Sequence, residues 1–341
     1  MILVLDYLVK RFIFPFSFLL IILLSSCGYD EGILEQYKGS IMGTTYKISF
    51  IEKTENITEK DIFSILKLVD KEMSTYDDAS LLSKINSSST GSWIPISINL
   101  AVVLKFSKDT CIDTGGAFDV SIGKIVNSWG FGPSQQNLIP SKEKIKELQS
   151  YVGCNAFELD FQNKKVKRNE DVYIDLSAVA KGFAVDLVAQ YLESKNIENY
   201  LIELGGELKV KGKKINEPWK VGIENPLQQG KPIFTLVTNG FNELSLATSG
   251  NYRNFIENNG IRVSHTFDPT SGLSISHNLA SVSVVSESVM KSDALATALN
   301  VMGLEQGLDY ANLNNIKALF ILVNDNKVLS YPSKEFKTLL N

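Results

Sequence analysis

The chain has 341 residues, a formal net charge of −4 and 44% hydrophobic residues, so it can bury a sizeable core. It lacks the clusters of lysine and arginine that bind nucleic-acid phosphates, which argues against a nucleic-acid partner. With only two histidines and no cysteine pairs at ligand spacing, the composition disfavours zinc or iron centres. Any metal should be a hard cation bound by oxygen atoms.

The first 27 residues have the pattern of a secretory signal. A basic pair, Lys10 and Arg11, precedes an apolar run over residues 12–24, and small residues lead to Cys27. That run is shorter than the roughly 20 residues of a membrane-spanning helix. The pattern resembles a bacterial lipobox, in which Cys27 becomes the lipidated first residue of the mature protein. A plain signal peptide or a membrane anchor is the alternative.

We therefore expect the chain to be held on a membrane outside the cytoplasm. The expected organisation is a signal over residues 1–27, a tether over residues 28–36 and one folded domain over residues 37–341. After Cys27 only Cys111 and Cys154 remain, too few for a disulfide framework. A single bridge between them is one alternative, but we expect two buried thiols.

In chain order, apolar periodicity predicts helices and strands without any internal repeat. Helices are expected at residues 58–73, about 100–113, 177–195 and from about 288 onward. Strands are expected at residues 44–52, 171–176, within 199–213 around a Gly-Gly break, at 219–225, within 235–250, within 261–268, at 279–286 and as a hairpin over 317–332. Because strands joined by short turns dominate the second half, we predict an α+β fold with mixed or antiparallel sheets and packed helices.

The segment SDALATAL places a carboxylate on an apolar helix face. Asp293 and Thr297 project from one side of the predicted helix, one turn apart, beside Val289, Met290 and Val301. A buried charge needs a partner, and a carboxylate with a hydroxyl suits a hard cation such as Mg²⁺. The alternative is an aspartate near a helix start that the helix dipole stabilises.

Two further segments suggest a bound ligand. Ser177 can cap the helix that follows it, and Gly182 beside Ala180 allows a close approach to a helix start that would suit phosphate. An ordinary capped helix explains the same residues. Residues 115–119 are a Gly-Gly turn followed by Ala117, Phe118 and Asp119, which could enclose a planar ring or simply end a helix.

His265 is followed by an Asp-Pro turn that contains Asp268. A histidine near a carboxylate can accept a proton near neutral pH, although a lone histidine in a strand is often structural. The second histidine, His277, lies in a polar stretch without such a turn. We expect its replacement to change little.

Together these segments resemble the ApbE family of FAD:protein FMN transferases, from about Tyr37 to the end of the chain. The resemblance rests on eight motifs in order: MGTTY, MSTYDDASLLSKIN, GGAFDVSIG with WGFGP, IDLSAVAKGFAVD, ELGGEL, ATSGNYRNF, HTFDPTSG and SDALATAL. It implies the T-fold-like architecture of that family. It also agrees with the lipobox, because many members are membrane-tethered lipoproteins.

The resemblance implies that FAD is split at its pyrophosphate, that FMN passes to a threonine or serine hydroxyl of a target protein, and that AMP leaves. It makes His265 the base that takes the hydroxyl proton, and it assigns Mg²⁺ to Asp293, Thr297 and the backbone carbonyl of Ala180. The implied FAD contacts are Met42, Tyr76, Ala117, Phe118, Asp119, Ser177, Lys181 and Asp268.

The implied acceptors are flavoprotein subunits of membrane redox complexes of the Rnf and Nqr type, which expose an Asp/Ser-Gly-Ala-Thr/Ser segment. Two alternatives stay open. One is an FAD pyrophosphatase that gives FMN and AMP, and the other is a flavin-binding lipoprotein without catalysis. His265, Asp293 and Thr297 together disfavour the second, because binding alone needs neither a base nor a divalent cation.

Overall fold

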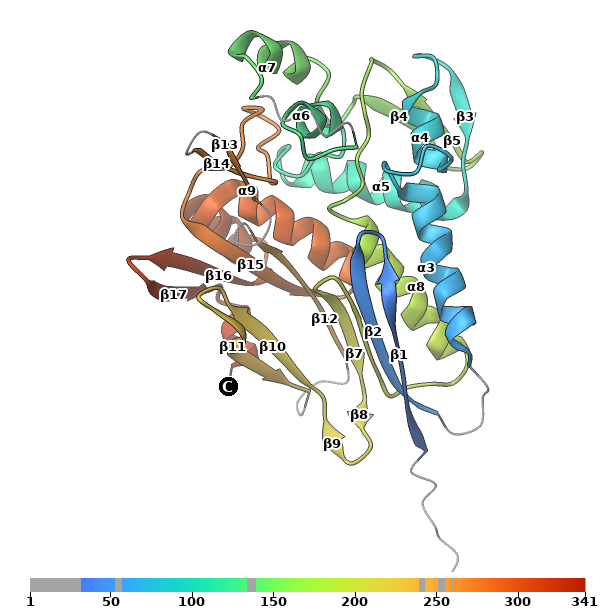
Figure 1. Cartoon of the computed structure of the whole chain (residues 1–341), viewed down its shortest axis with the longest axis vertical. Helices are drawn as coiled ribbons and strands as arrows, with labels where there is room; N and C mark the ends of the chain where they lie inside the picture. The colour runs from blue at the N-terminus through green and yellow to red at the C-terminus, as the bar shows by residue number, and fades with distance from the viewer. Residues whose placement is uncertain are drawn as a thin grey trace, which may run out of the picture.

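The computed structural model of the chain describes residues 32–52, 57–133, 139–238, 243–250, 255–258 and 261–340 (Figure 1). The signal and Cys27 lie outside the described residues. Among the described helices, none has both the length and the apolar composition that crossing a bilayer would need.

An eight-stranded antiparallel sheet forms the centre of the fold, in the order β1-β2-β6-β7-β12-β15-β16-β17. Its strands are β1 (Ile33–Ile41), β2 (Thr44–Glu52), β6 (Tyr200–Leu204), β7 (Glu207–Lys211), β12 (Glu243–Gly250), β15 (Leu279–Ser286), β16 (Lys317–Asn324) and β17 (Lys327–Pro332). The predicted α+β class with antiparallel pairing is therefore confirmed.

Smaller sheets surround this centre. Their strands are β3 (Trp93–Pro95), β4 (Phe157–Asp160), β5 (Lys165–Arg168), β8 (Lys213–Lys214), β9 (Glu217–Pro218), β10 (Lys220–Asn225), β11 (Gln228–Val237), β13 (Phe255–Asn258) and β14 (Ile261–Ser264). The β10–β11 hairpin packs on one face of the main sheet through Trp219, Val221, Ile223 and Leu236.

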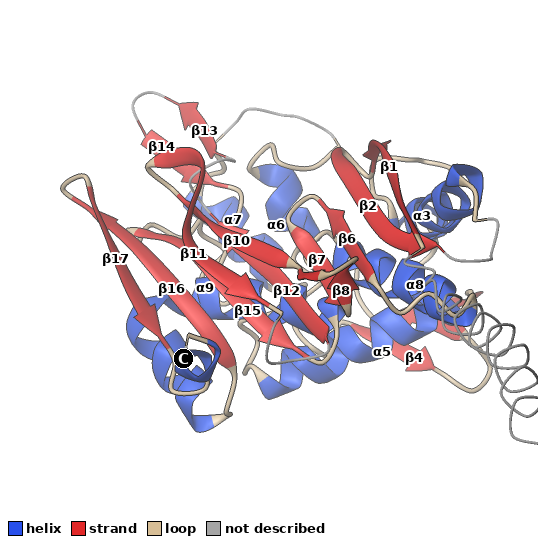
Figure 2. Cartoon of the chain, turned by 90° about the horizontal axis from the view of Figure 1, so that it is seen from below, coloured by secondary structure: helices blue, strands red, loops and turns tan. Residues whose placement is uncertain are grey.

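Helices cover the opposite face of the main sheet (Figure 2). The described helices are α3 (Glu59–Met73), α4 (Leu81–Asn86), α5 (Ile98–Asp113), α6 (Gly123–Ser128), α7 (Lys142–Gln149), α8 (Ala180–Ser194) and α9 (Val289–Leu313), with a final 3₁₀ turn η1 (Phe336–Leu339). Of these, α8 and α9 lie directly on the sheet, whereas α6 and α7 pack beside Val263 and Phe267. Because both of its faces are covered, β15 is buried along nearly its whole length.

Serine and threonine caps explain where several predicted helices begin. Thr58 forms a capping box with Asp61 at the start of α3, and Ser97 and Ser288 accept backbone N–H groups at the starts of α5 and α9. The prediction of a Ser177 cap is wrong. Its hydroxyl lies 2.5 Å from Asp175 Oδ1, and the N-cap position of α8 is Val179, which makes no side-chain cap.

Residues 171–176 do not form the predicted strand. Only an isolated bridge joins Tyr173 to Ile122. The backbone of Ile174 is instead paired at both its N–H and its C=O with the side-chain amide of Asn86, and Asp175 N–H donates to Val120 O. The Asn86 side chain and the Val120 carbonyl satisfy these backbone groups, so they do not need a neighbouring strand.

The folded domain starts earlier than we expected. Strand β1 begins at Ile33, which pairs with Glu52 of β2, so residues 33–36 belong to the sheet and not to a tether. From Gln36 to Ile41, β1 alternates between exposed residues and residues that are partly or fully buried, as expected for a strand with one solvated face.

The expectation of two free thiols is also wrong. Cys111, near the end of α5, is joined by a disulfide to Cys154 in the loop before β4, with their Cα atoms 5.6 Å apart. The bridge closes a long loop that includes α6 and α7. A cross-link over such a loop stabilises the fold by restricting the unfolded chain, typically by about 2–4 kcal/mol.

Candidate active site

A cavity of about 1220 Å³ opens where three chain segments meet: the β1–β2 turn, the β6–β7 turn and the start of α8. The pairing of β2 with β6 brings the two turns side by side, and Gly205 N–H donates to Thr45 O across them. Most of the predicted site residues line this cavity: Met42, Tyr76, Ala117, Phe118, Asp119, Ser177, Lys181, His265, Asp293 and Thr297.

Two predicted residues, Ala180 and Asp268, are not among the lining residues. Ala180 is the buried first residue of α8, next to Lys181. Asp268 Oδ1 accepts the Thr270 N–H at 2.8 Å, and its backbone closes the turn with Gly272. Asp268 thus shapes the turn after His265, as expected, while its contact with FAD stays a prediction.

The floor of the cavity holds one lysine between two buried acids. Lys181 Nζ lies 3.0 Å from Glu207 Oε1 and 4.0 Å from Asp293 Oδ2. Glu207 is 3% exposed and Asp293 is 5% exposed. Burial raises the pKa of Glu207 to about 8 and raises the pKa of Asp293, and Lys181 partly opposes both shifts.

Burial alone would lower the pKa of Lys181, but the two carboxylates outweigh burial and raise it, so the ammonium is firmly charged. Sequence reasoning did not single out Glu207, although it lies in the ELGGEL motif. The signal that could have identified Glu207 as a site residue is its position, at the start of a strand directly after a Gly-Gly turn.

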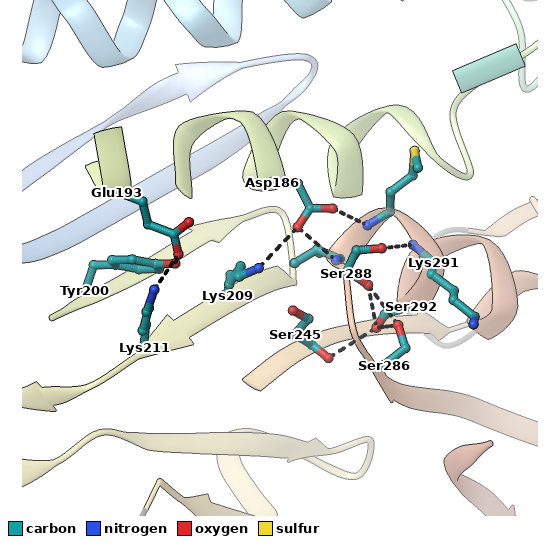
Figure 3. Close-up of polar contacts among 12 residues, drawn as sticks. Asp186, Glu193, Tyr200, Lys209, Lys211, Ser245, Ser286, Ser288, Lys291 and Ser292 are labelled. Carbon is teal, nitrogen blue, oxygen red and sulfur yellow. Dashed lines mark hydrogen bonds and ion pairs between the residues drawn. The ribbon is translucent and has the colours of Figure 1, made fainter. Parts of the chain in front are cut away.

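The contact between α8 and α9 fixes the position of Asp293. Gly182 lies so close to α9 that a Cβ there would come within 2.5 Å of Val289 O, and its N–H donates to Asp293 Oδ2 at 3.1 Å. Asp186, one turn later in α8, accepts the N–H groups of Val289 and Met290 at 3.0 and 2.9 Å (Figure 3). Asp186 therefore caps α9 from a neighbouring helix.

The remaining contacts of this junction anchor both helices to the sheet. Figure 3 shows Ser292 reaching the backbone carbonyls of Ser245 and Ser288. In the same view Glu193, near the end of α8, accepts the Tyr200 hydroxyl and pairs with Lys211. These contacts make α8 and α9 a rigid frame for the cavity floor.

The floor has the donor atoms that a hard cation needs. Asp293 is buried and accepts one hydrogen bond, from Gly182, and no cation lies closer to it than the 4.0 Å of Lys181 among the described residues. Thr297 lines the cavity one helical turn further on. A carboxylate and a hydroxyl at this spacing fit Mg²⁺, which completes its octahedron with water or phosphate oxygens.

A soft metal has no comparable site in the described part of the chain. There, the one cluster of three or more potential ligands among histidine, cysteine and acidic residues is Cys111, Asp119 and Cys154. The disulfide occupies both of its thiols.

The turn at residues 115–121 presents Asp119 to the cavity. Asp119 Oδ1 accepts the N–H and the hydroxyl of Ser121 at 2.8 and 2.6 Å, and burial raises the pKa of Asp119. Ser121 in turn accepts the Gly153 N–H, directly before the bridged Cys154. The disulfide thus lies next to the segment that holds this turn through Ser121.

His265 lies half-buried at an aromatic wall of the cavity. Its ring centroid is 6.5 Å from that of Phe131, which packs edge-on against Phe267 at 5.6 Å. Tyr76 is 64% exposed, and its hydroxyl donates to Phe131 O at 2.8 Å. Phe131, which we did not predict, lies in the WGFGP part of a motif quoted above. Aromatic faces at a cavity mouth suit a planar ring.

His277 is not the unconstrained residue that we expected. Its Nε2 lies 2.8 Å from Asn300 O, and its ring packs against Gly303. Gly303 interrupts α9 with a φ of 76°. The imidazole therefore supplies a partner for a carbonyl near the break in α9, so its replacement should affect stability.

Comparisons with known proteins agree with this geometry. Residues 42–320 match the model of the ApbE family. The chain is 38% identical to the FAD:protein FMN transferase of Haemophilus influenzae, covering 93% of this chain and 94% of the relative. It is 37% identical to that of Vibrio cholerae, covering 89% and 92%.

Solved structures show the same fold. The flavin transferase ApbE from Vibrio cholerae superposes with a TM-score of 0.80 at 35% identity, covering 90% of this chain and 100% of the other. The apo flavinyl transferase ApbE of Pseudomonas stutzeri gives 0.81 at 31% identity, covering 90% and 96%. With a matching family model, full-length relatives and a shared fold that places the motif residues around one cavity, the chain belongs to the ApbE family.

Proposed function

We propose that this chain transfers FMN from FAD to a threonine or serine hydroxyl of a target protein, with Mg²⁺ as the cofactor and AMP as the leaving group. The relatives named above are FAD:protein FMN transferases and support this activity. The observation that carries the proposal is that a buried carboxylate, Asp293, faces the same cavity as the imidazole of His265. Binding alone would require neither group.

In this proposal Asp293, Thr297 and the carbonyl of Ala180 hold Mg²⁺, which supplies positive charge for the transferring phosphoryl group. Lys181 adds a fixed ammonium at the start of α8 for the pyrophosphate. Asp119 and Ser177 line the cavity near that end, and Tyr76, Met42 and Phe118 provide the apolar surface for the ring systems.

The reaction would proceed by attack of the acceptor oxygen on the FMN phosphorus of FAD. The new bond joins that phosphorus to the acceptor oxygen, and the bond from the same phosphorus to the bridging oxygen breaks, so AMP leaves. His265 takes the proton of the acceptor hydroxyl, and the Asp268 turn holds His265 in place. The protein's main contribution is to position groups and to balance charge.

Incubation of the protein with FAD and Mg²⁺, with and without an acceptor flavoprotein, tests this function. Protein-bound flavin that survives denaturation, formed together with an equal amount of AMP, is the expected result. AMP and free FMN without any labelled acceptor would indicate the pyrophosphatase alternative. Absence of AMP under both conditions would support a binding protein without catalysis.

We further propose that the acceptors are subunits of membrane redox complexes of the Rnf and Nqr type, and that a lipid on Cys27 holds the enzyme at the outer side of the cytoplasmic membrane. Cys27 stands at the end of the signal pattern, far in sequence from every cavity residue. Two acyl chains of a lipoprotein would give stable anchoring.

Replacing Cys27 with serine is expected to release the enzyme from the membrane and to leave its turnover unchanged. Membrane fractionation with a radiolabelled fatty acid, followed by the AMP assay on both fractions, measures this. A Cys27→Ser protein that still carries the lipid label would contradict the proposed anchor.

A further inference from the structure

Glu207 has a buried carboxylate that the proposed reaction leaves without a role. Its Oε1 pairs with Lys181 at 3.0 Å, and its Oε2 accepts no hydrogen bond from the described residues. Burying a carboxylate costs free energy that a single ion pair rarely repays. A buried glutamate at the floor of the cavity therefore requires an explanation beyond stability.

The arrangement of the charges of Lys181, Glu207 and Asp293 explains why Glu207 is buried there. Lys181 Nζ is a full contact partner of Glu207 but stands 4.0 Å from Asp293 Oδ2, at the limit of an ion pair. Asp293 is left with one hydrogen bond, from the neutral backbone N–H of Gly182. The carboxylate proposed to bind the cation is thus not neutralised by a contact with the nearby lysine.

We propose that Glu207 is a positioning residue that draws the Lys181 ammonium away from Asp293 and thereby keeps Asp293 available for a divalent cation. The inference rests on the proposed function, because it assumes that Asp293 is a metal ligand. Lysine has a flexible four-carbon stem, so its ammonium follows the nearest anion. If Glu207 lost its charge, Asp293 would be the carboxylate left within ion-pair distance of Lys181 among the described residues, so the ammonium would move toward Asp293.

The same pair serves the substrate. Lys181 stays charged between the two acids and is held near the start of α8, where its Nζ also lies 3.5 Å from Ser177 O. Its charge is therefore presented beside the cation site without occupying it. A dinucleotide pyrophosphate would then meet the Lys181 ammonium and the cation at two separate places.

Binding of Mn²⁺ to the ligand-free protein tests this, because Mn²⁺ accepts the same oxygen ligands and its free form is counted by electron paramagnetic resonance. Glu207→Gln keeps the size of the side chain and is expected to raise the Kd for Mn²⁺ by roughly 10- to 100-fold, as for other residues that orient metal ligands. Glu203→Gln is the matched control: Glu203 lines the same cavity two residues before Gly205, but it accepts the Gly206 N–H and does not pair with Lys181. Its replacement should leave the Kd close to that of the wild type.

A double-mutant cycle separates positioning from simple charge. Lys181→Met alone removes the competing ammonium and should bind Mn²⁺ at least as tightly as the wild type. On that background Glu207→Gln should have little further effect. If Glu207→Gln lowers the Mn²⁺ affinity equally in the wild type and in Lys181→Met, Glu207 acts only through its own charge, and the inference is overturned. A Kd for Mn²⁺ in Glu207→Gln that equals the wild-type value would overturn it too.

Asp293→Ala distinguishes the failure of the inference from that of the proposed function. Saturable Mn²⁺ binding that survives Asp293→Ala would contradict the metal site itself. Loss of binding in Asp293→Ala together with unchanged binding in Glu207→Gln would overturn only the role of Glu207. The thermal midpoint of each variant shows whether it is folded. If Glu207→Gln does not fold, Lys181→Met alone still tests the proposal, because weaker Mn²⁺ binding by that variant would contradict it.

Discussion

Replacing Asp293 with alanine is expected to lower the rate of AMP release from FAD by two or more orders of magnitude and to abolish its dependence on Mg²⁺. Asp293 is the buried acid of the cavity floor with no cation in close contact, and a bound metal stabilises the charge that develops during phosphoryl transfer. Lys181 is not expected to replace the ion, because Glu207 holds its ammonium and an ammonium cannot coordinate phosphate oxygens as a divalent cation does. Initial rates over a range of Mg²⁺ concentrations measure the effect.

Asp293→Asn is the matched variant, because an amide oxygen can still accept the Gly182 N–H while the negative charge is lost. We expect it to be nearly as impaired as Asp293→Ala. Asp293→Asn should keep a thermal midpoint close to that of the wild type, whereas Asp293→Ala leaves the buried Gly182 N–H without this acceptor and should lower it. Normal, Mg²⁺-dependent AMP release by a folded Asp293→Ala protein would place the ion elsewhere.

His265→Ala should slow transfer of FMN to an acceptor by roughly 10²- to 10⁴-fold, the usual size of a general-base contribution. FAD affinity should change little, because the other lining residues supply most of the cavity. Since only neutral imidazole can take a proton, the wild-type rate should fall as the solution becomes acidic enough to protonate a histidine. Single-turnover transfer, FAD affinity and thermal midpoint, measured on the same preparations, test this.

His277 provides the contrast. Its imidazole lies against Gly303 and within hydrogen-bonding distance of Asn300 O, so His277→Ala should lower the thermal midpoint while the folded protein transfers FMN near the wild-type rate. A purely structural role for His265 predicts the same pattern for His265→Ala. Transfer at the wild-type rate by His265→Ala would rule out its role as the base.

The sequence predicted the placement of neighbouring side chains well wherever a motif fixes the local backbone conformation. Asp293 and Thr297 share a helix face because the period of a helix is fixed, and the Asp268 turn follows from its proline. Partners from distant segments were missed. Nothing in the chain order shows that Glu207 meets Lys181, or that Asn86 pairs with the backbone of Ile174 and thereby replaces a strand ladder.

The two cysteines show the same limit. Their separation of 43 residues says nothing about distance in space, and buried free thiols are common in proteins. Folding brings Cys111 to Cys154 because α5 and the loop before β4 pack against the same turn, at Asp119 and Ser121. Ser177 was misassigned for a related reason: Asp175, two residues earlier, competes for its hydroxyl.

Strand β1 also separates the start of the described domain from the cavity. It runs from Ile33 to the turn at Met42, which lines the cavity, so the first strand residue and the cavity lie at opposite ends of one strand (Figure 1). Nine residues at about 3.4 Å each separate them by roughly 30 Å. The lipid proposed for Cys27 would thus join the fold at the end of β1 that lies away from the cavity, and the acceptor threonine or serine would meet the enzyme at the opposite end of that strand.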